Sequence, residues 1–302
     1  MDGSIYFFRG YFGIPETLVD PSGRSVNGVL GFAQALLAIS GSYYRNGSLA
    51  GGEGGCAVAF DESLGTGFRH RLYAPYKANR ALPDAEIRRQ FRDCQALCRC
   101  LGIPCWASAE HEADDFLATL SARSRLPTTI YSKDKDLHQL INRKTSVRDI
   151  QPGGHWNLST ALEHYGFSLA LLPDYQALVG DVSDNVPGVP GVGPKTAARL
   201  VARYGSLEQV LASVPGWASD GFGLPPSGRV ATGLVDFGQR ALQMRELLRL
   251  KTSVPLPAGA TRRGNIDLSG LARWLKRTGL DRRLIRALEA SGVRTDGKAV
   301  RE

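Results

Sequence analysis

The sequence predicts an α/β protein in which helices cover both faces of a mostly parallel sheet, followed by a helical region. Helical and strand-like segments alternate between about residues 28 and 150, which is typical of a parallel sheet covered by helices. From about residue 158 onward, helical segments joined by Gly- and Pro-rich turns replace this alternation. We therefore expect a sheet domain at 1–157, a helical domain at 158–260 and a basic C-terminal extension at 261–302.

The expected elements of the sheet domain follow one another along the chain. Residues 27–39 have helical spacing, residues 56–60 (CAVAF) read as a short strand, and residues 83–102 read as a helix that begins with Pro-Asp and ends at a glycine. A further helix begins within the acidic segment EADD at 112–115, and residues 128–132 (TTIYS) read as another strand.

Carboxylates follow these strands. Asp61 ends one strand, Asp134 and Asp136 follow another, and Asp2 precedes a turn-like Gly-Ser pair. Because ligands of parallel sheets bind beyond the carboxyl ends of the strands, we expect these side chains to converge at one edge. Each position also has a purely structural interpretation, since Asp and Glu are common at helix starts and in turns.

The helical region has its centre at 178–201, LVGDVSDNVPGVPGVGPKTAARLV. Gly188, Gly191 and Gly193 permit tight turns and close backbone approach, and a proline suits the first position of the helix that follows. Free N–H groups at such a hairpin can bind a phosphate, and Lys195 adds a positive charge there. The alternative is a plain helix-turn-helix corner.

The overall composition favours a polyanionic partner. The 302 residues carry a formal net charge of +8, with a pI near 9.4, and 43% of them are apolar, enough for a sizeable core. No apolar run is long enough for a membrane span, and the N-terminus lacks signal-peptide features, so we expect a cytoplasmic protein with no membrane partner. The five cysteines read as core residues of a reducing compartment rather than as a zinc site.

Six segments, in this order and at this spacing, resemble the 5′ nucleases: the N-terminal nuclease domain of bacterial DNA polymerase I, phage 5′ exonucleases, flap endonucleases and free-standing bacterial 5′ to 3′ exonucleases. Each segment is weak alone, but the ordered set is specific and covers roughly residues 2 to 255. The segments are DGSIYFFRGYF, FDESLGTGFRHRLYAPYKANR, EADD, SKDKDL, GDVSDNVPGVPGVGPKTA and YGSLEQVL.

The resemblance implies a PIN-like catalytic domain, a helical domain with a helix-three-turn-helix, and two divalent metal ions. Nine crowded carboxylates would repel one another without cations, and oxygen ligands favour Mg²⁺ or Mn²⁺. Asp134 would be catalytic and would lie between the two ions. The first ion would be surrounded by Asp2, Asp61, Glu112, Asp114 and Asp115, and the second served by Asp134, Asp136, Asp181 and Asp184.

The resemblance also implies how DNA is held. Arg69, Lys77 and Arg80 would contact the scissile phosphate or a threaded 5′ strand, with Lys77 and Arg80 catalytic, and Tyr76 would stack on a base. The hairpin with Gly188, Gly191, Gly193 and Lys195 would bind duplex DNA and hold a K⁺ ion on its backbone carbonyls. Alternatively, these basic residues belong to a solvated surface without a functional role.

One departure from the family pattern concerns the start of the chain. The family has an apolar strand before its first Asp, whereas only Met1 precedes Asp2 here. We expect the true start to lie upstream; a missing strand would leave Asp2 on a frayed terminus and weaken the first metal site. The C-terminal residues read as a basic helix and a loose tail that could add to DNA affinity.

The expected function is therefore a Mg²⁺-dependent, structure-selective 5′ nuclease acting on DNA with a free 5′ end or 5′ flap. Water is the nucleophile in such a two-metal mechanism. We expect a monomer in the bacterial cytoplasm, associated with the nucleoid, that works with a separate polymerase and ligase. Two alternatives stay open: a DNA-structure-binding protein that does not cut, and a nuclease of the same fold that acts on RNA or an RNA:DNA hybrid.

Overall fold

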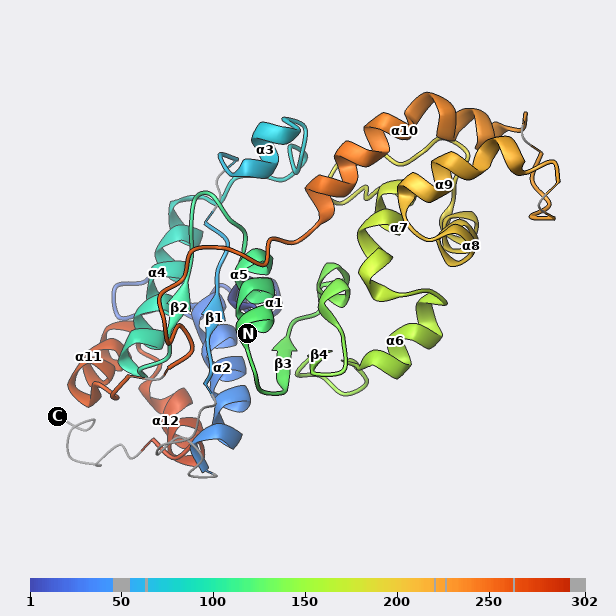
Figure 1. The fold of residues 1–302 in the computed structure, drawn as a ribbon. Helices are drawn as coiled ribbons and strands as arrows, with labels where there is room; N and C mark the ends of the chain where they lie inside the picture. The colour runs from blue at the N-terminus through green and yellow to red at the C-terminus, as the bar shows by residue number, and fades with distance from the viewer. Residues whose placement is uncertain (46–54, 63–64, 220, 226, 263, 294–302) are drawn as a thin grey trace.

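The chain forms a sheet-containing part and a helical part, and its C-terminal helices return to the first of these (Figure 1). The computed structural model describes residues 1–45, 55–62, 65–219, 221–225, 227–262 and 264–293. No helix in these ranges is long and apolar enough to cross a membrane.

The sheet-containing part comprises α1 (Gly3–Gly13), α2 (Asn27–Arg45), β1 (Val58–Ala59), α3 (Phe68–Leu72), α4 (Ala85–Cys100), β2 (Cys105–Trp106), α5 (Ala113–Arg123), β3 (Thr128–Tyr131), the 3₁₀ helix η1 (Lys135–Leu140), β4 (Thr145–Arg148) and β5 (His155–Trp156). The helical part comprises α6 (Leu158–Tyr165), η2 (Leu169–Leu171), α7 (Leu172–Val179), α8 (Pro194–Tyr204), α9 (Leu207–Ser213), η3 (Val214–Gly216) and α10 (Arg229–Leu248). The chain then continues to α11 (Leu268–Thr278) and α12 (Asp281–Ala290).

The strands form a short, mostly parallel sheet, as expected. β1 pairs with β2 in parallel, β3 pairs with β4 in parallel from Thr128↔Thr145 to Tyr131↔Arg148, and β5 adds to β4 in antiparallel orientation. Asp2 joins the two groups, because it forms a parallel bridge with Ala59 and its N–H donates to the Tyr131 carbonyl at 2.9 Å. The resulting order is β2, β1, Met1–Asp2, β3, β4, β5.

The expectation that Asp2 would be frayed without a preceding strand is wrong. Met1 and Asp2 are 7% and 3% exposed. The Met1 ammonium donates to the Ala57 carbonyl at 2.8 Å, and the Met1 carbonyl accepts from the Ala59 N–H at 3.0 Å. Asp2 also caps α1 by accepting from the Ile5 N–H. Two residues, bonded on both sides, therefore take the central place in the sheet.

The described residues of 261–302 include the expected basic helix, but they do not form the separate extension that we expected. α11 packs on α4 and α12 on α2 (Figure 1). Leu271, Trp274, Leu275, Leu284 and Leu288 are buried in the same hydrophobic core as α1, α2 and α4. Each helix has its apolar residues on one side and its charged residues on the other, so burying the apolar side requires this docking. Residues 294–302 lie outside the described residues.

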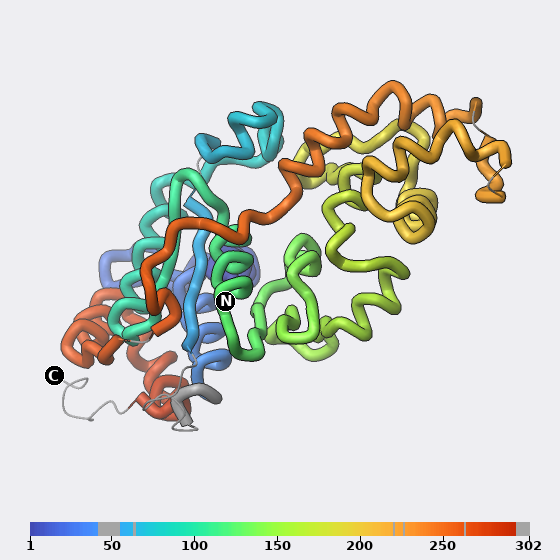
Figure 2. The backbone as a smooth tube through the Cα atoms, in the orientation of Figure 1, coloured from blue at the N-terminus to red at the C-terminus, as the bar shows by residue number. Residues whose placement is uncertain are grey.

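Between α10 and α11, an extended segment (residues 249–262), which we call the strap, leads from the helical part back across the sheet-containing part (Figure 2). It is hydrogen-bonded along its length: the Lys251 N–H donates to Asp115, the Arg123 guanidinium to the carbonyls of Val254 and Leu256, and the Trp106 indole to the Ala260 carbonyl. The helical part has its own core, which includes Leu200 and Leu207. The strap, through these hydrogen bonds, thus holds the helical part to the sheet-containing part.

Candidate functional site

A cleft of about 220 Å³ lies between the carboxyl edge of the sheet and the helical part. Eight of the nine predicted carboxylates line it, and Asp115 does not. The eight are Asp2, Asp61, Glu112, Asp114, Asp134, Asp136, Asp181 and Asp184.

Strand ends place four of these carboxylates, and the start of α5 places two more. Asp2 follows Met1 in the centre of the sheet, and Asp61 follows β1. Glu112 is the N-cap of α5 and Asp114 lies in its first turn, while Asp134 caps η1 directly after β3 and Asp136 lies in its first turn. Asp181 and Asp184 come from the turn after α7, which the Asp181–Val186 bridge closes.

Neighbouring polar groups that the sequence did not single out orient these carboxylates. The Ser132 hydroxyl donates to Asp2 Oδ2 at 2.8 Å, and the Gln176 amide donates to Asp136 Oδ1 at 2.5 Å. The Ser4 hydroxyl accepts from the Asp61 N–H at 2.8 Å. Ser4 and Ser132 lie in segments that resemble the family, next to predicted metal ligands, so the sequence could have indicated them. Gln176 lies in no such segment, and nothing in the sequence pointed to it.

Five of the cleft carboxylates form no ion pair with any residue that the structure describes. We call Asp2, Asp61, Asp114, Asp134 and Asp136 the unpaired carboxylates. Burial, with the charges of Asp61 and Asp134, raises the pKa of Asp2 to about 7. Burial, with Asp134 and Asp184, likewise raises the pKa of Asp136 to about 7.

Asp114 lies at the centre of this repulsion. Burial and then the charges of Asp134, Asp2 and Asp61 raise the pKa of Asp114 well above its usual value. Loss of hydration within the protein raises the pKa of Asp61 as well, and the charge of Glu112 raises it further, although its side chain is exposed to the cleft. The unpaired carboxylates therefore concentrate negative charge that the ammonium groups of Lys77 and Lys135, each paired with another carboxylate, offset only in part.

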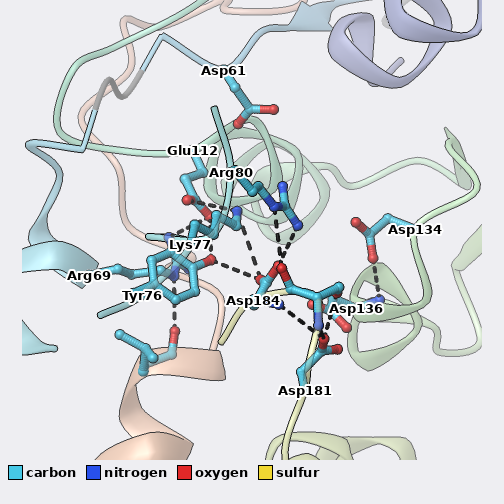
Figure 3. Close-up of polar contacts among 12 residues, drawn as sticks. Asp61, Arg69, Tyr76, Lys77, Arg80, Glu112, Asp134, Asp136, Asp181 and Asp184 are labelled. Carbon is cyan, nitrogen blue, oxygen red and sulfur yellow. Dashed lines mark hydrogen bonds and ion pairs between the residues drawn. The ribbon is translucent and has the colours of Figure 1, made fainter. Parts of the chain in front are cut away.

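Four other carboxylates do have cationic partners, and we call Glu112, Asp115, Asp181 and Asp184 the paired carboxylates. Lys77 Nζ lies 2.9 Å from Glu112, Lys135 Nζ lies 2.7 Å from Asp181, and the Arg80 guanidinium contacts Asp184. Figure 3 shows Lys77, Arg80 and Tyr76 gathered around Glu112 and Asp184, with Asp61 and Asp134 apart from them. Burial alone would raise the pKa of Glu112, but the charges of Lys77 and Arg69 outweigh it and lower that pKa.

Two predicted DNA-contacting residues are buried instead. Arg69 is 3% exposed, makes a two-bond ion pair with Asp115 at 2.6 and 2.8 Å, and donates to the Leu247 carbonyl at 2.9 Å. Tyr76 is 4% exposed, and its hydroxyl donates to Glu112 or Asp184, at 3.0 and 3.2 Å. Both residues border the cleft, but their polar atoms are engaged by neighbouring protein groups (Figure 3).

Lys77 and Arg80 remain accessible to a ligand in the cleft. Arg80 has a side chain 53% exposed, and that of Lys77 is 20% exposed. Lys77 has φ of +53°, uncommon for a residue with a Cβ, and its N–H donates to the Asp184 carbonyl at 2.9 Å. This contact ties the segment after α3 to the turn that carries Asp184.

The glycine-rich hairpin lies outside the cleft and leads into α8. A Cβ on Gly188 would lie 2.2 Å from the Val179 carbonyl oxygen, so only glycine allows this close approach. Gly191 has φ of +85°, and Gly193 is the exposed N-cap of α8, with nothing within 4 Å of a Cβ added there. Lys195 is exposed in the first turn of α8. The hairpin thus presents backbone and one cation to solvent.

The residues of the cleft fit divalent metal ions in charge and chemistry. All the donors are carboxylate oxygens, which suit Mg²⁺ or Mn²⁺, and the raised pKa values mark charge that a bound cation would neutralise. Within the described chain, however, no three His, Cys, Asp or Glu side chains are already close enough together to hold an ion.

Comparison with known families assigns both parts of the chain. Residues 1–166 match the family described as "5′-3′ exonuclease, N-terminal resolvase-like domain", and residues 168–266 match "5′-3′ exonuclease, C-terminal SAM fold".

Named relatives are of two lengths. DNA polymerase I of Rhizobium leguminosarum is 34% identical over 85% of this chain but only 24% of its own length, so the chain spans about a quarter of that relative. A 5′-3′ exonuclease of Streptomyces coelicolor is 32% identical over 95% of this chain and 98% of its own.

Two solved structures share the fold. The T5 D15 protein, crystallised with metal ions, superposes with a TM-score of 0.64 at 19% identity, over 96% of this chain and 97% of its own. The catalytic core of Rad2 in complex with DNA has a TM-score of 0.60 at 16% identity, over 95% and 91% of the two chains. At such identities the likeness establishes the fold alone, and it extends across both parts of the chain.

Proposed function

The chain belongs to the 5′-3′ exonuclease family, and from this premise we propose that it is a divalent-metal-dependent, structure-selective 5′ nuclease that hydrolyses DNA phosphodiester bonds. Its substrates would be DNA with a free 5′ end and DNA with a 5′ flap. The fold relatives crystallised with metal ions and with DNA support this proposal.

The observation that carries the proposal is the group of unpaired carboxylates in the cleft. Three of them, Asp2, Asp114 and Asp136, have pKa values raised by burial and by their neighbours, so near neutral pH their negative charge is either removed by a proton or balanced by a bound cation. A site that only bound DNA would place positive, not negative, charge against phosphate.

The metal ligands would divide between two positions. Asp2, Asp61 and Asp114 would hold the first ion, with Asp134 between the two, and Asp136, Asp181 and Asp184 would hold the second. Mg²⁺ or Mn²⁺ held by these residues would supply Lewis-acid chemistry for activating water and for stabilising charge on the leaving oxygen. Lys77 and Arg80, accessible in the same cleft, would neutralise the phosphate that is cut.

Other residues would position rather than contact the substrate. Arg69 binds Asp115, whose oxygens also accept from the N–H groups of Glu112 and Lys251, so this pair would hold the start of α5 against α3 and the strap. Tyr76 would orient Glu112 and Asp184 through its hydroxyl. Glu112 would then act on the first ion only through water or after Lys77 moves.

The hairpin at 188–195 would bind the duplex next to the cut. Its exposed backbone and Lys195 suit contact with phosphates without reading bases, and carbonyls there would hold K⁺. We further propose a monomer in the bacterial cytoplasm, near the nucleoid, that acts with a separate polymerase and ligase.

The test uses a 5′-flap duplex, the matching RNA:DNA hybrid and an all-RNA flap, each with Mg²⁺. We expect the wild type to cut the DNA flap best. The Asp134→Asn variant should lose at least about a hundredfold in rate yet bind the flap in EDTA as the wild type does. The exposed Glu163, outside the cleft, provides the control Glu163→Gln, which should cut normally. Binding without cutting by the wild type would contradict the proposal, and faster cutting of RNA would change its substrate.

A further inference from the structure

Charge is distributed unequally between the two proposed metal positions. Asp2, Asp61 and Asp114, at the first position, have no ion pair within the described residues. At the second position, Asp181 and Asp184 each already contact a cationic side chain. At the first position the nearby Lys77 ammonium is paired with Glu112 rather than with these three carboxylates, so a divalent ion would displace no direct ion pair from them, whereas at the second position it would meet carboxylates already paired with protein cations.

Lys135 is the cation that faces the second position most directly. It is the first residue of η1, between Asp134 and Asp136, and Nζ lies 2.7 Å from Asp181 Oδ2. Burial alone would lower the pKa of its ammonium, but the carboxylates of Asp181, Asp136 and Asp134 outweigh burial and raise that pKa. The function described above leaves Lys135 without a role.

The partner of Lys135 has one oxygen free of other bonds. Asp181 Oδ1 accepts from the Ser183 N–H, the Ser183 hydroxyl and the Asp184 N–H at 2.8, 2.5 and 3.2 Å. Within the described chain, Asp181 Oδ2 has only the Lys135 ammonium. The Asp181 side chain is 5% exposed and that of Lys135 is 62% exposed. The carboxylate is fixed, whereas the lysine can swing into water.

We propose that Lys135 is a tethered counter-ion that stands where the second divalent ion binds, so that this ion must displace it from Asp181. The inference rests on the proposed metal-dependent function. Before the ion arrives, the ammonium holds Asp181 toward Asp134 and Asp136 and limits their repulsion. Displacement is feasible because an exposed ammonium regains its hydration, but breaking the ion pair makes the second binding step weaker than the first.

The test measures metal binding by the free protein, without DNA. Isothermal titration with Mn²⁺ should show two unequal steps for the wild type. Lys135→Met should tighten the weaker step by roughly threefold to thirtyfold, the effect of removing one charge near the ion in a partly screened site, and leave the tighter step within about twofold. Lys135→Arg retains the positive charge and should keep the weaker step weak.

Lys133 provides the matched control. It lies two residues earlier in the same segment, is exposed, and has no ion pair within the described chain, so Lys133→Met should change neither step. In EDTA, Lys135→Met should also lower the thermal unfolding midpoint, because Asp181 loses its partner, whereas Lys133→Met should not.

Two outcomes separate this inference from the function on which it rests. If the wild type binds two ions and Lys135→Met leaves the weaker step unchanged, or weakens it, the tethered counter-ion is wrong and the two-metal function stands. If the wild type binds no Mn²⁺, both the proposed function and this inference are overturned.

Discussion

Asp114 and Asp115 are neighbours in the chain, yet their carboxylates have opposite environments. Asp115 is fully buried and bound to Arg69, whereas Asp114 faces the cleft and has no hydrogen bond or ion pair within the described residues. On a helix, adjacent side chains point about 100° apart, so one faces the protein and the other the cleft. At the residue scale, this difference separates a structural carboxylate from a candidate ligand.

The raised pKa of Asp114 predicts a pH-dependent cost to stability. The folded protein binds the Asp114 proton more tightly than the unfolded chain does, so stability falls as pH rises from about 4, the usual Asp value, through the folded pKa. The neighbouring Asp2 and Asp136 have pKa values of about 7, so their contribution to the loss of stability occurs below about pH 7. Asp114→Asn should therefore unfold at a higher temperature than the wild type at pH 8 in EDTA.

The advantage of Asp114→Asn should shrink as pH falls toward 4, because the carboxyl of the unfolded chain is then protonated as well and the two states differ less in bound protons. The comparison between variant and wild type is needed because buried His138, whose pKa is lowered to about 4, makes stability rise with pH over the same interval. Saturating Mg²⁺ should remove or reverse the advantage. Equal unfolding temperatures for the two proteins at pH 8 in EDTA would contradict the repulsion argued here.

We expected Arg69 to bind DNA, but its buried ion pair with Asp115 predicts that replacing it will strongly lower stability. Arg69→Met would leave Asp115 buried without its partner, at a cost of about 3–5 kcal/mol in the free energy of unfolding, measured with denaturant. The double variant Arg69→Met/Asp115→Leu should recover much of this loss. Arg71, two residues away and 60% exposed, pairs with the exposed Glu110, so Arg71→Met should leave the free energy unchanged. A small effect of Arg69→Met would mean that the pair does not hold α5.

At the scale of elements, α11 and α12 change the boundary of the sheet-containing part. Sequence composition separates residues 261–302 as a basic extension, but their apolar side chains complete the core beneath α2 and α4. The charged residues that dominate the composition are those left facing solvent, among them Arg273, Arg282, Arg283 and Arg286. The charge of this segment therefore reflects the solvent-facing side of the two helices and gives no information on the apolar side that packs in the core.

Trp274 provides the test of this docking. It is 3% exposed in the core, and its indole N–H donates to the Asp93 carbonyl at 2.9 Å. Trp274→Ala should cost about 3–5 kcal/mol in the free energy of unfolding of the whole protein, measured by denaturant titration. The adjacent Arg273 is exposed, so Arg273→Ala should have little effect. If Trp274→Ala matched Arg273→Ala, the C-terminal helices would not be part of the core.

At the scale of the whole molecule, positive net charge and a carboxylate cleft coexist. The protein carries +8 overall, but the cleft concentrates eight carboxylates between the sheet and the helical part. In the proposed function, the bulk charge would attract DNA from a distance, whereas the local negative charge would have to be offset by metal ions before a phosphate could enter. The strap and the Lys77–Asp184 backbone contact hold the two parts around this cleft.

DNA binding should accordingly depend steeply on salt. In EDTA, where no cutting occurs, the logarithm of the affinity for a 5′-flap duplex should fall linearly with log salt, with a slope of about −0.9 per phosphate contacted. Lys195→Met should reduce that slope by about one, measured by fluorescence anisotropy, if Lys195 contacts a phosphate. Lys144, also exposed but on the sheet-containing part, provides the control Lys144→Met with an unchanged slope. A wild-type affinity that ignores salt would argue against a backbone-reading interface.

The sequence by itself determined the fold class and the order of the acidic segments. Local signals were enough for this: alternation of helical and strand-like segments, caps such as Asp84 and Glu112, and carboxylates placed at strand ends. Parallel topology then brought those ends to one edge, and eight of the nine predicted carboxylates line the cleft there.

Only the tertiary structure decided which of those carboxylates carry a partner. Arg80 and Asp184 are 104 positions apart, and Arg69 meets the Leu247 carbonyl across 178 positions. Ion pairing and burial depend on distances in space between such residues, and no local pattern encodes them. For the same reason the burial of Arg69 and Tyr76, the central place of Asp2 and the docking of α11 and α12 appeared only once the chain was folded.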